Sequence, residues 1–220
     1  VNNSVSITAQ SSSQTVCSGS SPSFSITAAG TAPITYQWYK GNTAISGATN
    51  NAFSLTSVDT SNASTYYVIA TNSCNSIQSN QIILTVNESP SINSQPSNST
   101  VCVGSSAQLS VSATGTAPLT YQWYKGSTLI SGATNSLYLI SQAATTDAST
   151  YYVKVTNSCG NVSSSSASIT VNSPVSITTQ SGNTTKCTSN SVTFSVTATG
   201  TGPLTYQWYK GASAISGASS

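Results

Sequence analysis

One unit occurs three times along this chain, in register. Its copies are GTAPITYQWYKG from Gly30, GTAPLTYQWYKG from Gly115 and GTGPLTYQWYKG from Gly200. The copies follow one another at a constant step of 85 (115 − 30 and 200 − 115), and the cysteines at positions 17, 102 and 187 keep the same step. A period of this length, in which each unit has its own Trp and cysteines, predicts a tandem array of small domains rather than one enzyme fold.

The same period predicts where each unit begins and ends. The dipeptide VN at residues 1–2 matches the VN at 86–87 and at 171–172. We therefore assign residues 1–2 to the end of a preceding repeat, 3–87 to repeat 1, 88–172 to repeat 2 and 173–220 to the first half of repeat 3. Because repeat 3 lacks the second half of the unit, we expect it to be completed by sequence that follows Ser220 or by strands of a neighbouring chain.

Charge excludes one class of partner. The 220 residues contain five Lys or Arg, three Asp or Glu and no His, for a net charge of +2 at pH 7. No basic stripe is available to neutralise phosphates, so we expect no nucleic acid partner. No apolar run approaches the roughly 20 residues of a membrane span, so none is expected in this sequence.

Short segments of alternating polar and apolar residues, bounded by Ser, Gly, Asn or Pro, predict an all-β fold. In repeat 2 we expect strands near 107–113, 119–125, 136–140, 150–155 and 166–171. Side chains alternate between the two faces of a strand, so the apolar set of each should point into the core. That set comprises Leu109, Val111, Leu119, Tyr121, Trp123, Tyr138, Ile140, Tyr151, Val153, Val155, Ile169 and Val171.

A motif near the end of each complete repeat identifies the type of sandwich. The run DASTY, which ends at Tyr151, resembles the Asp-x-Gly-x-Tyr motif before strand F of immunoglobulin-like (Ig-like) domains, and repeat 1 has NASTY with Asn62 in place of the acid. The Gly-x-x-Pro before the Trp and the Trp-Tyr-Lys-Gly that includes it complete the resemblance. It implies tandem Ig-like β-sandwiches, two complete and one truncated, similar to the Ser/Thr-rich repeats of large secreted or surface-anchored bacterial proteins, many of them adhesins.

The cysteines depart from the pattern of vertebrate-type Ig domains. The positions of the usual disulfide between the two sheets hold Ile26 and Val68 in repeat 1, and Val residues in repeat 2. Cys17 and Cys102 instead precede strand B, and Cys74 and Cys159 follow strand F. Both sets have one spacing, 57 (74 − 17 and 159 − 102), and no His or acidic cluster offers metal ligation. We therefore predict Cys17–Cys74 and Cys102–Cys159 disulfides, with the partner of Cys187 near position 244. Such bonds imply an oxidising compartment, outside the cell or on its surface.

The sequence offers no catalytic or metal site. The chain has no His, and its three acids, Asp59, Glu88 and Asp147, are too scattered to form a carboxylate pair or a nucleophile with its base. We therefore expect no enzyme, metal or cofactor. Lys40, Lys125 and Lys210 stand before Gly at the end of strand C, where a solvent-facing turn residue is a simpler interpretation than a covalent crosslink.

The outward face of the sheet that contains strands C, F and G is the candidate contact surface. Tyr favours interfaces, and weak charge offers little repulsion between neighbours. Cross-strand pairs of this kind can equally serve only to stabilise the sheet. We define the contact face as Gln37, Tyr39, Tyr67, Ile69 and Ile83 in repeat 1 and Gln122, Tyr124, Tyr152, Lys154 and Ser168 in repeat 2.

Together these features predict a structural and adhesive segment of an extracellular stalk or filament. Expected partners are neighbouring repeats of the same chain, copies of the chain laterally or end to end, and surface glycans or proteins. The alternative is a set of glycan-binding, protein-binding or spacer modules of a larger secreted enzyme. A catalytic domain elsewhere in the full protein would favour the alternative, whereas many further repeats would favour the stalk.

Overall fold

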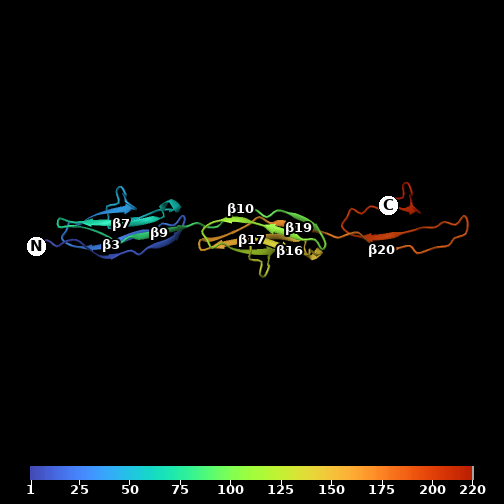
Figure 1. Cartoon of the computed structure of the whole chain (residues 1–220), viewed down its shortest axis with the longest axis horizontal. Coiled ribbons are helices and arrows are strands. Elements are labelled where there is room, and N and C mark those ends of the chain that lie inside the picture. Colours follow the sequence, from blue (N-terminus) through green and yellow to red (C-terminus); the bar gives the residue numbers. More distant parts are fainter. Residues whose placement is uncertain (220) are drawn as a thin grey trace. The chain divides into compact units, whose positions relative to one another are not determined.

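A computed structural model of the chain describes residues 1–219 and is almost entirely β-structure (Figure 1). The chain divides into two compact units. One contains residues 1–93, 113–120 and 155–162, and the other contains residues 94–112, 121–154 and 163–220. Residues 88–93, 113–120 and 155–162 of repeat 2 therefore belong to the same compact unit as repeat 1.

Repeat 1 folds into two sheets. The larger has the strand order β2-β9-β7-β4-β5, with β8 paired to β7, and the smaller has the order β1-β3-β6. A single 3-10 turn, η1 (Thr60–Asn62), precedes β7. The strands are β1 (Ser6–Gln10), β2 (Gln14–Cys17), β3 (Ser23–Ala29), β4 (Thr35–Lys40), β5 (Thr43–Ala44), β6 (Ala52–Ser54), β7 (Ser64–Thr71), β8 (Ser76–Gln78) and β9 (Ile82–Asn87).

Repeat 2 has the same topology, with a larger sheet of order β11-β19-β17-β14-β15, β18 on β17, and two short pairs, β10-β13 and β12-β16. The predicted strand at 107–113 is interrupted at Val111, and β10, β11, β15 and β18 were not predicted. The elements are β10 (Ser91–Ser94), β11 (Ser99–Cys102), β12 (Ala107–Ser110), β13 (Ser112–Thr114), β14 (Thr120–Lys125), β15 (Thr128–Leu129), β16 (Leu137–Ile140), η2 (Thr145–Asp147), β17 (Ser149–Asn157), β18 (Gly160–Ser163) and β19 (Ala167–Asn172).

The first strand of each repeat is divided between the two sheets. β1 pairs antiparallel with β3 in the smaller sheet, whereas β2 pairs parallel with β9 in the larger one. In that parallel register Cys17 lies opposite Asn87, the last residue of the repeat. β11 and β19 repeat this arrangement, with Cys102 opposite Asn172. The first cysteine of each complete repeat therefore lies where the chain leaves that repeat.

The core forms around one Trp in each complete repeat, as predicted. Trp38 and Trp123 have no exposed surface. Their indole N–H groups donate to the carbonyls of Asn50 and Asn135, each at 2.9 Å, which satisfies the one polar atom that burial would otherwise leave unpaired. The alternation predicted for strand C is thus confirmed, and with it the inward direction of the neighbouring apolar residues.

The predicted tyrosine corner is present in both complete repeats. The buried Tyr66 and Tyr151 hydroxyls each donate at 2.8 Å to a carbonyl four residues upstream, of Asn62 and Asp147 respectively. Asn62 replaces the acid without loss of its contact, because its side-chain oxygen accepts the Asp59 N–H as Asp147 accepts that of Ala144, each at 2.9 Å.

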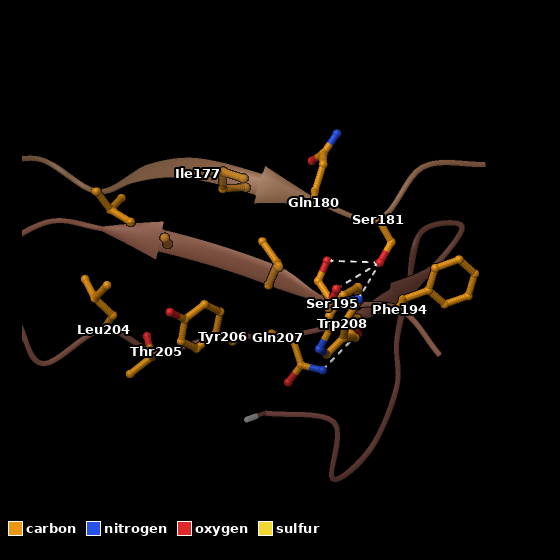
Figure 2. Close-up of a pocket in the computed structure, with 13 residues that line it drawn as sticks. Ile177, Gln180, Ser181, Phe194, Ser195, Leu204, Thr205, Tyr206, Gln207 and Trp208 are labelled. Carbon is orange, nitrogen blue, oxygen red and sulfur yellow. Dashed lines mark hydrogen bonds between the residues drawn. The ribbon is translucent and has the colours of Figure 1, made fainter. Parts of the chain in front are cut away.

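Repeat 3 contains only β20 (Ser176–Gln180) paired with β21 (Val196–Thr199), and β22 (Tyr209–Lys210) paired with β23 (Ser213–Ala214), within the described residues. Phe194 is 52% exposed, whereas its counterpart Phe24 is 1% exposed. The apolar residues of this half repeat line an open groove of about 650 Å³, in which Leu204, Tyr206 and Trp208 follow one another along one side (Figure 2).

A glycine contact at the start of each repeat yields a prediction. Gly30 has φ +151°, and a Cβ atom there would lie 2.9 Å from the Val5 Cα. Gly41 has φ +54°, but a Cβ atom there would meet nothing within 4 Å. Gly30→Ala should lower the free energy of unfolding by roughly 2–3 kcal/mol through strain and a backbone clash, and Gly41→Ala by roughly 1 kcal/mol through strain alone. Urea denaturation of both variants measures the difference, and equal losses would contradict the clash.

Burial of Tyr151 predicts a dependence of stability on alkaline pH. Burial, with smaller contributions from Tyr138 and Asp147, raises the pKa of Tyr151 from 10.0 to about 12. Because the folded state favours the neutral phenol, its contribution to stability is complete below pH 10 and is lost as pH rises through 12. Tyr151→Phe should cost about 1 kcal/mol at pH 8, and the difference from the parent chain should shrink above pH 10. Thermal unfolding of both proteins from pH 8 to 11 tests this, and a constant difference would refute it.

Candidate functional site

A disulfide joins Cys17 to Cys159, with 5.6 Å between their Cα atoms. The predicted Cys17–Cys74 and Cys102–Cys159 pairings are therefore wrong. Cys74, Cys102 and Cys187 are exposed and form no disulfide within the described residues. The bond links the end of β2 in repeat 1 to the loop between β17 and β18 in repeat 2. Both cysteines belong to the compact unit that contains repeat 1.

The strand directions explain why pairing within one repeat fails. Cys17 lies opposite Asn87, where repeat 1 ends. Cys74 follows β7, which is antiparallel to β9, and the neighbouring Asn72 side chain donates to the Asn3 carbonyl at 2.8 Å, where repeat 1 begins. The two cysteines are thus at opposite ends of a sheet whose strands of six to eight residues span roughly 20–25 Å, whereas a disulfide requires about 4.4–6.8 Å between Cα atoms.

The residues between β9 and β10 form the linker, which we define as Glu88, Ser89 and Pro90. The Glu88 carbonyl accepts from the Asn157 side chain at 2.7 Å and from the Thr116 N–H at 3.1 Å. The Glu88 N–H donates to the Thr116 hydroxyl at 2.7 Å, and the Ser89 hydroxyl donates to the Cys159 carbonyl at 3.2 Å. We call these contacts the linker clamp.

Asn87, the residue before the linker, is bound by repeat 1. The Ser18 N–H donates to the Asn87 carbonyl at 2.8 Å. Ser18 is next to Cys17 and belongs to repeat 1, whereas the clamp residues belong to repeat 2. The disulfide therefore lies beside the linker and joins the two segments that bind it.

The linker clamp recurs with the period of the sequence. Asn3 exchanges two hydrogen bonds with Thr31, at 2.7 and 3.1 Å, as Glu88 does with Thr116. Ser173 exchanges two with Thr201, at 2.7 and 3.0 Å. Because every contact through position 88 uses its backbone, Asn, Glu and Ser can all occupy it. The sequence signal for this site is the Thr that follows the first Gly of each repeated unit, to which we assigned no role from the sequence alone.

The structure brings together the central pairs of the predicted contact face. The Tyr39 and Tyr67 rings stack with centroids 4.9 Å apart, and those of Tyr124 and Tyr152 are 4.8 Å apart. Ile69 is paired in register with Gln37, and Ile83 is 52% exposed. The Gln37 and Gln122 amides donate to the Ile45 and Ile130 carbonyls, at 2.8 and 2.7 Å, which fixes their orientation. Binding by this face remains a prediction.

Comparison with known families assigns both complete repeats. Residues 5–87 match the model of an Ig-like domain described as CHU_C associated, and residues 89–157 match the model of an immunoglobulin domain. The chain is a tandem array of Ig-like domains.

Solved structures agree with this fold. A three-domain fragment of titin, I67–I69 in an E-to-A variant, has a TM-score of 0.80 at 21% identity, over 97% of this array and 81% of that chain. Domains 3–5 of Drosophila OTK have a TM-score of 0.57 at 19% identity, over 76% of this array and 61% of that chain. At these identities the likeness concerns the fold alone.

A curated relative is the highly immunogenic outer capsid protein of Enterobacteria phage T4. It is 33% identical over 115 residues, which are 47% of this array and 30% of the phage protein. The array therefore matches less than a third of that protein's length. In residues 1–219, no helix is long and apolar enough to cross a membrane.

The lysines after strand C of the array bind the turns before strand F. Lys40 donates to the Ser61 carbonyl at 2.7 Å, and Lys125 donates to the Thr146 carbonyl at 2.6 Å. The Lys125 ammonium also lies 3.7 Å from an Asp147 carboxylate oxygen. Hydrogen bonds from the Ser61 hydroxyl and N–H lower the pKa of Asp59. No group of three or more His, Cys, Asp or Glu side chains among the described residues could hold a metal ion.

The observed pairing predicts the thiol chemistry of the array. Of its five cysteines, Cys74, Cys102 and Cys187 should react with a thiol reagent under denaturing, non-reducing conditions. Cys17→Ser and Cys159→Ser should each increase the reactive thiols from three to four, because each releases a partner. Cys102→Ser is the matched control and should decrease them to two. A cross-linked peptide that contains Cys17 and Cys74 would contradict the structure.

Proposed function

We propose that this array is a load-bearing structural and adhesive segment of an extracellular stalk or filament. The observation that carries the proposal is the Cys17–Cys159 disulfide beside the linker. A covalent bond that joins consecutive repeats has little use in a soluble monomeric binding domain, because each sandwich already has its own buried core. It is useful where consecutive domains must stay together under force.

The disulfide changes the path that tension takes along the chain. Tension applied at the two ends passes from Cys17 to Cys159 through the sulfur atoms, and the segment 18–158 lies outside that path. The disulfide thereby shields from tension all of repeat 1 after β2 and all of repeat 2 as far as the end of β17. The linker clamp alone would protect less, because its hydrogen bonds contribute only about 0.5–1.5 kcal/mol each.

The same bond supports the location outside the cell. Disulfides persist in oxidising compartments and are rare in reducing ones. Cys17 and Cys159 are only half-buried, so in the cytosol their bond would be open to reduction, and the junction would then depend on the linker clamp alone. We place the array at the cell surface or beyond it.

The adhesive part of the proposal rests on the contact face. Each complete repeat presents one stacked Tyr pair there, and Tyr provides both apolar area and a hydroxyl to an interface. The net charge of +2 leaves little repulsion between copies. Copies of the array, surface glycans and surface proteins are its proposed partners.

We infer that the array has no catalytic role of its own, because it has no His and the carboxylates of two of its three acids are already used in the structure. Asp59 accepts the Ser61 N–H at 2.8 Å, Asp147 accepts the Ala144 N–H, and Glu88 participates through its backbone. The alternative, spacer modules of a larger secreted enzyme, uses the same mechanics but requires a catalytic domain elsewhere in the protein.

Pulling single molecules by their ends tests the load-bearing role. The oxidised array should release no contour length from the segment 18–158, whereas the reduced array should release about 500 Å, at roughly 3.6 Å for each residue of that segment. Cys17→Ser should behave as reduced under both conditions, and Cys102→Ser should match the parent chain. Release of the full length from the oxidised parent would refute shielding. Immunogold labelling of thin sections of the source cells tests the location, and label confined to the cell interior would overturn it.

A further inference from the structure

Cys102 lies where the chain leaves repeat 2, and its surroundings match those of Cys17, which lies where the chain leaves repeat 1. Cys102 lies opposite Asn172, and the Val103 N–H donates to the Asn172 carbonyl at 2.8 Å, as the Ser18 N–H does to that of Asn87. The turn after each cysteine is also the same, because the Ser105 N–H donates to the Cys102 carbonyl at 3.0 Å and the Ser20 N–H to that of Cys17 at 3.1 Å. Cys102 is exposed and unbonded within the described residues.

Part of a linker clamp is present in the segment that follows repeat 2. Ser173 exchanges its two hydrogen bonds with Thr201, as Glu88 does with Thr116. The element that carries Cys159 in repeat 2, the loop between β17 and β18, has its counterpart in the second half of a repeat. Repeat 3 contains no such loop within residues 173–219, so the bonding partner of this position is a segment that a complete repeat would supply.

At the start of repeat 1, the opposite half of such a junction is present. The Asn72 side chain donates to the carbonyls of Asn3 and Thr31, at 2.8 and 3.1 Å, as that of Asn157 does to those of Glu88 and Thr116 at 2.7 and 2.9 Å. Cys74 occupies the place of Cys159 in this loop and is exposed. Each complete repeat therefore has one cysteine suited to the repeat after it and one suited to the repeat before it.

We propose that Cys102 and Cys74 are attachment sites for adjacent Ig-like repeats of this type, so that one disulfide bridges every junction of the array. Cys102 bonds the loop cysteine of the repeat that follows, at the sequence separation of 142 that the Cys17–Cys159 bond has. Cys74 bonds the strand-end cysteine of the repeat that precedes. The proposal extends the observed pairing to all junctions and holds whether or not the array adheres to a surface.

The chemistry of each bridge balances with an ordinary thiol oxidant. Two thiols each lose a proton, one S–S bond forms, and the electron pair reduces a disulfide such as oxidised glutathione to two thiols. The protein supplies proximity, because the linker clamp holds the loop cysteine beside the strand end. The pairing within a repeat has no such proximity, since its two cysteines are at opposite ends of the sheet.

An extended chain tests the proposal. Appending a copy of residues 136–172 after Ser220 completes repeat 3 and places its loop cysteine at position 244, which is separated from Cys102 by 142. After refolding with oxidised and reduced glutathione, we expect two disulfides instead of one, with Cys102 bonded to position 244 and with Cys74 and Cys187 free. Burial of Trp208, measured by its fluorescence, shows independently whether repeat 3 has folded.

Two matched variants of the extended chain separate the pairings. Cys102→Ser should remove the second disulfide and leave Trp208 buried, whereas Cys187→Ser should keep both disulfides. Loss of the second disulfide in Cys187→Ser, or a free thiol at position 244 in a folded repeat 3, would overturn the proposal. Non-reducing peptide maps of the native protein provide a second test that does not depend on the extension. Cross-links between cysteines at a separation of 142 are expected there, and cross-links within one repeat would refute it.

Discussion

The parallel pairing of β2 with β9 determines where the other features of each repeat lie. Because the first strand of the repeat leaves the smaller sheet and joins the larger one beside the last strand, it ends at the exit of the domain. Cys17 therefore lies beside the linker rather than beside the strand F loop of its own repeat. The antiparallel direction of β7 places that loop at the entrance, where Asn72 binds the segment through which the chain enters the repeat. With those two strand directions set, cysteines at the two places cannot pair within one repeat.

The entrance of the repeat tolerates sequence change because its hydrogen bonds are satisfied locally. In repeat 1 the Val5 N–H donates to the Asn75 side chain at 2.6 Å, and the same side chain donates back to the Val5 carbonyl at 3.2 Å. In repeat 2 these positions are Pro90, which has no N–H, and Gly160, which has no side chain. The donor and its acceptor have disappeared together, so no buried N–H is left unpaired. The close contact of Gly30 with Val5 persists as that of Gly115 with Pro90, since it depends on the backbone alone.

Much of the fold was predictable from the sequence because its signals are local. The alternation around Trp38 and Trp123 gave the correct inward face, and the spacing to Tyr151 gave the tyrosine corner. The division of the first strand was not predictable, because β10 and β11 are short and lack a clear alternation. The predicted disulfide pairing was wrong for a different reason. In an array of period 85, a spacing of 57 and a spacing of 142 describe the same two positions in the repeat, and periodicity cannot distinguish a bond within a repeat from one to the next. Only the strand directions distinguish them.

For the mechanics of the array, whether a disulfide lies within a repeat or joins two repeats matters more than how many disulfides there are. A disulfide within each repeat would shield the residues between its own cysteines and leave every linker as the sole connection between domains. A disulfide between repeats overlaps the linker, so the covalent path from one repeat to the next is doubled.

With a bridge at each junction, the shortest covalent path would run along the chain only from Cys159 to Cys187 before it enters the next bridge. Of the two whole repeats between Cys17 and Cys187, only that short segment would then contribute to the length that tension can extend. Tension could extend the remainder only after a sulfur bond had broken. Such an array resists extension through its covalent connections and not through the strength of any one sandwich, which is consistent with the small apolar cores of its repeats.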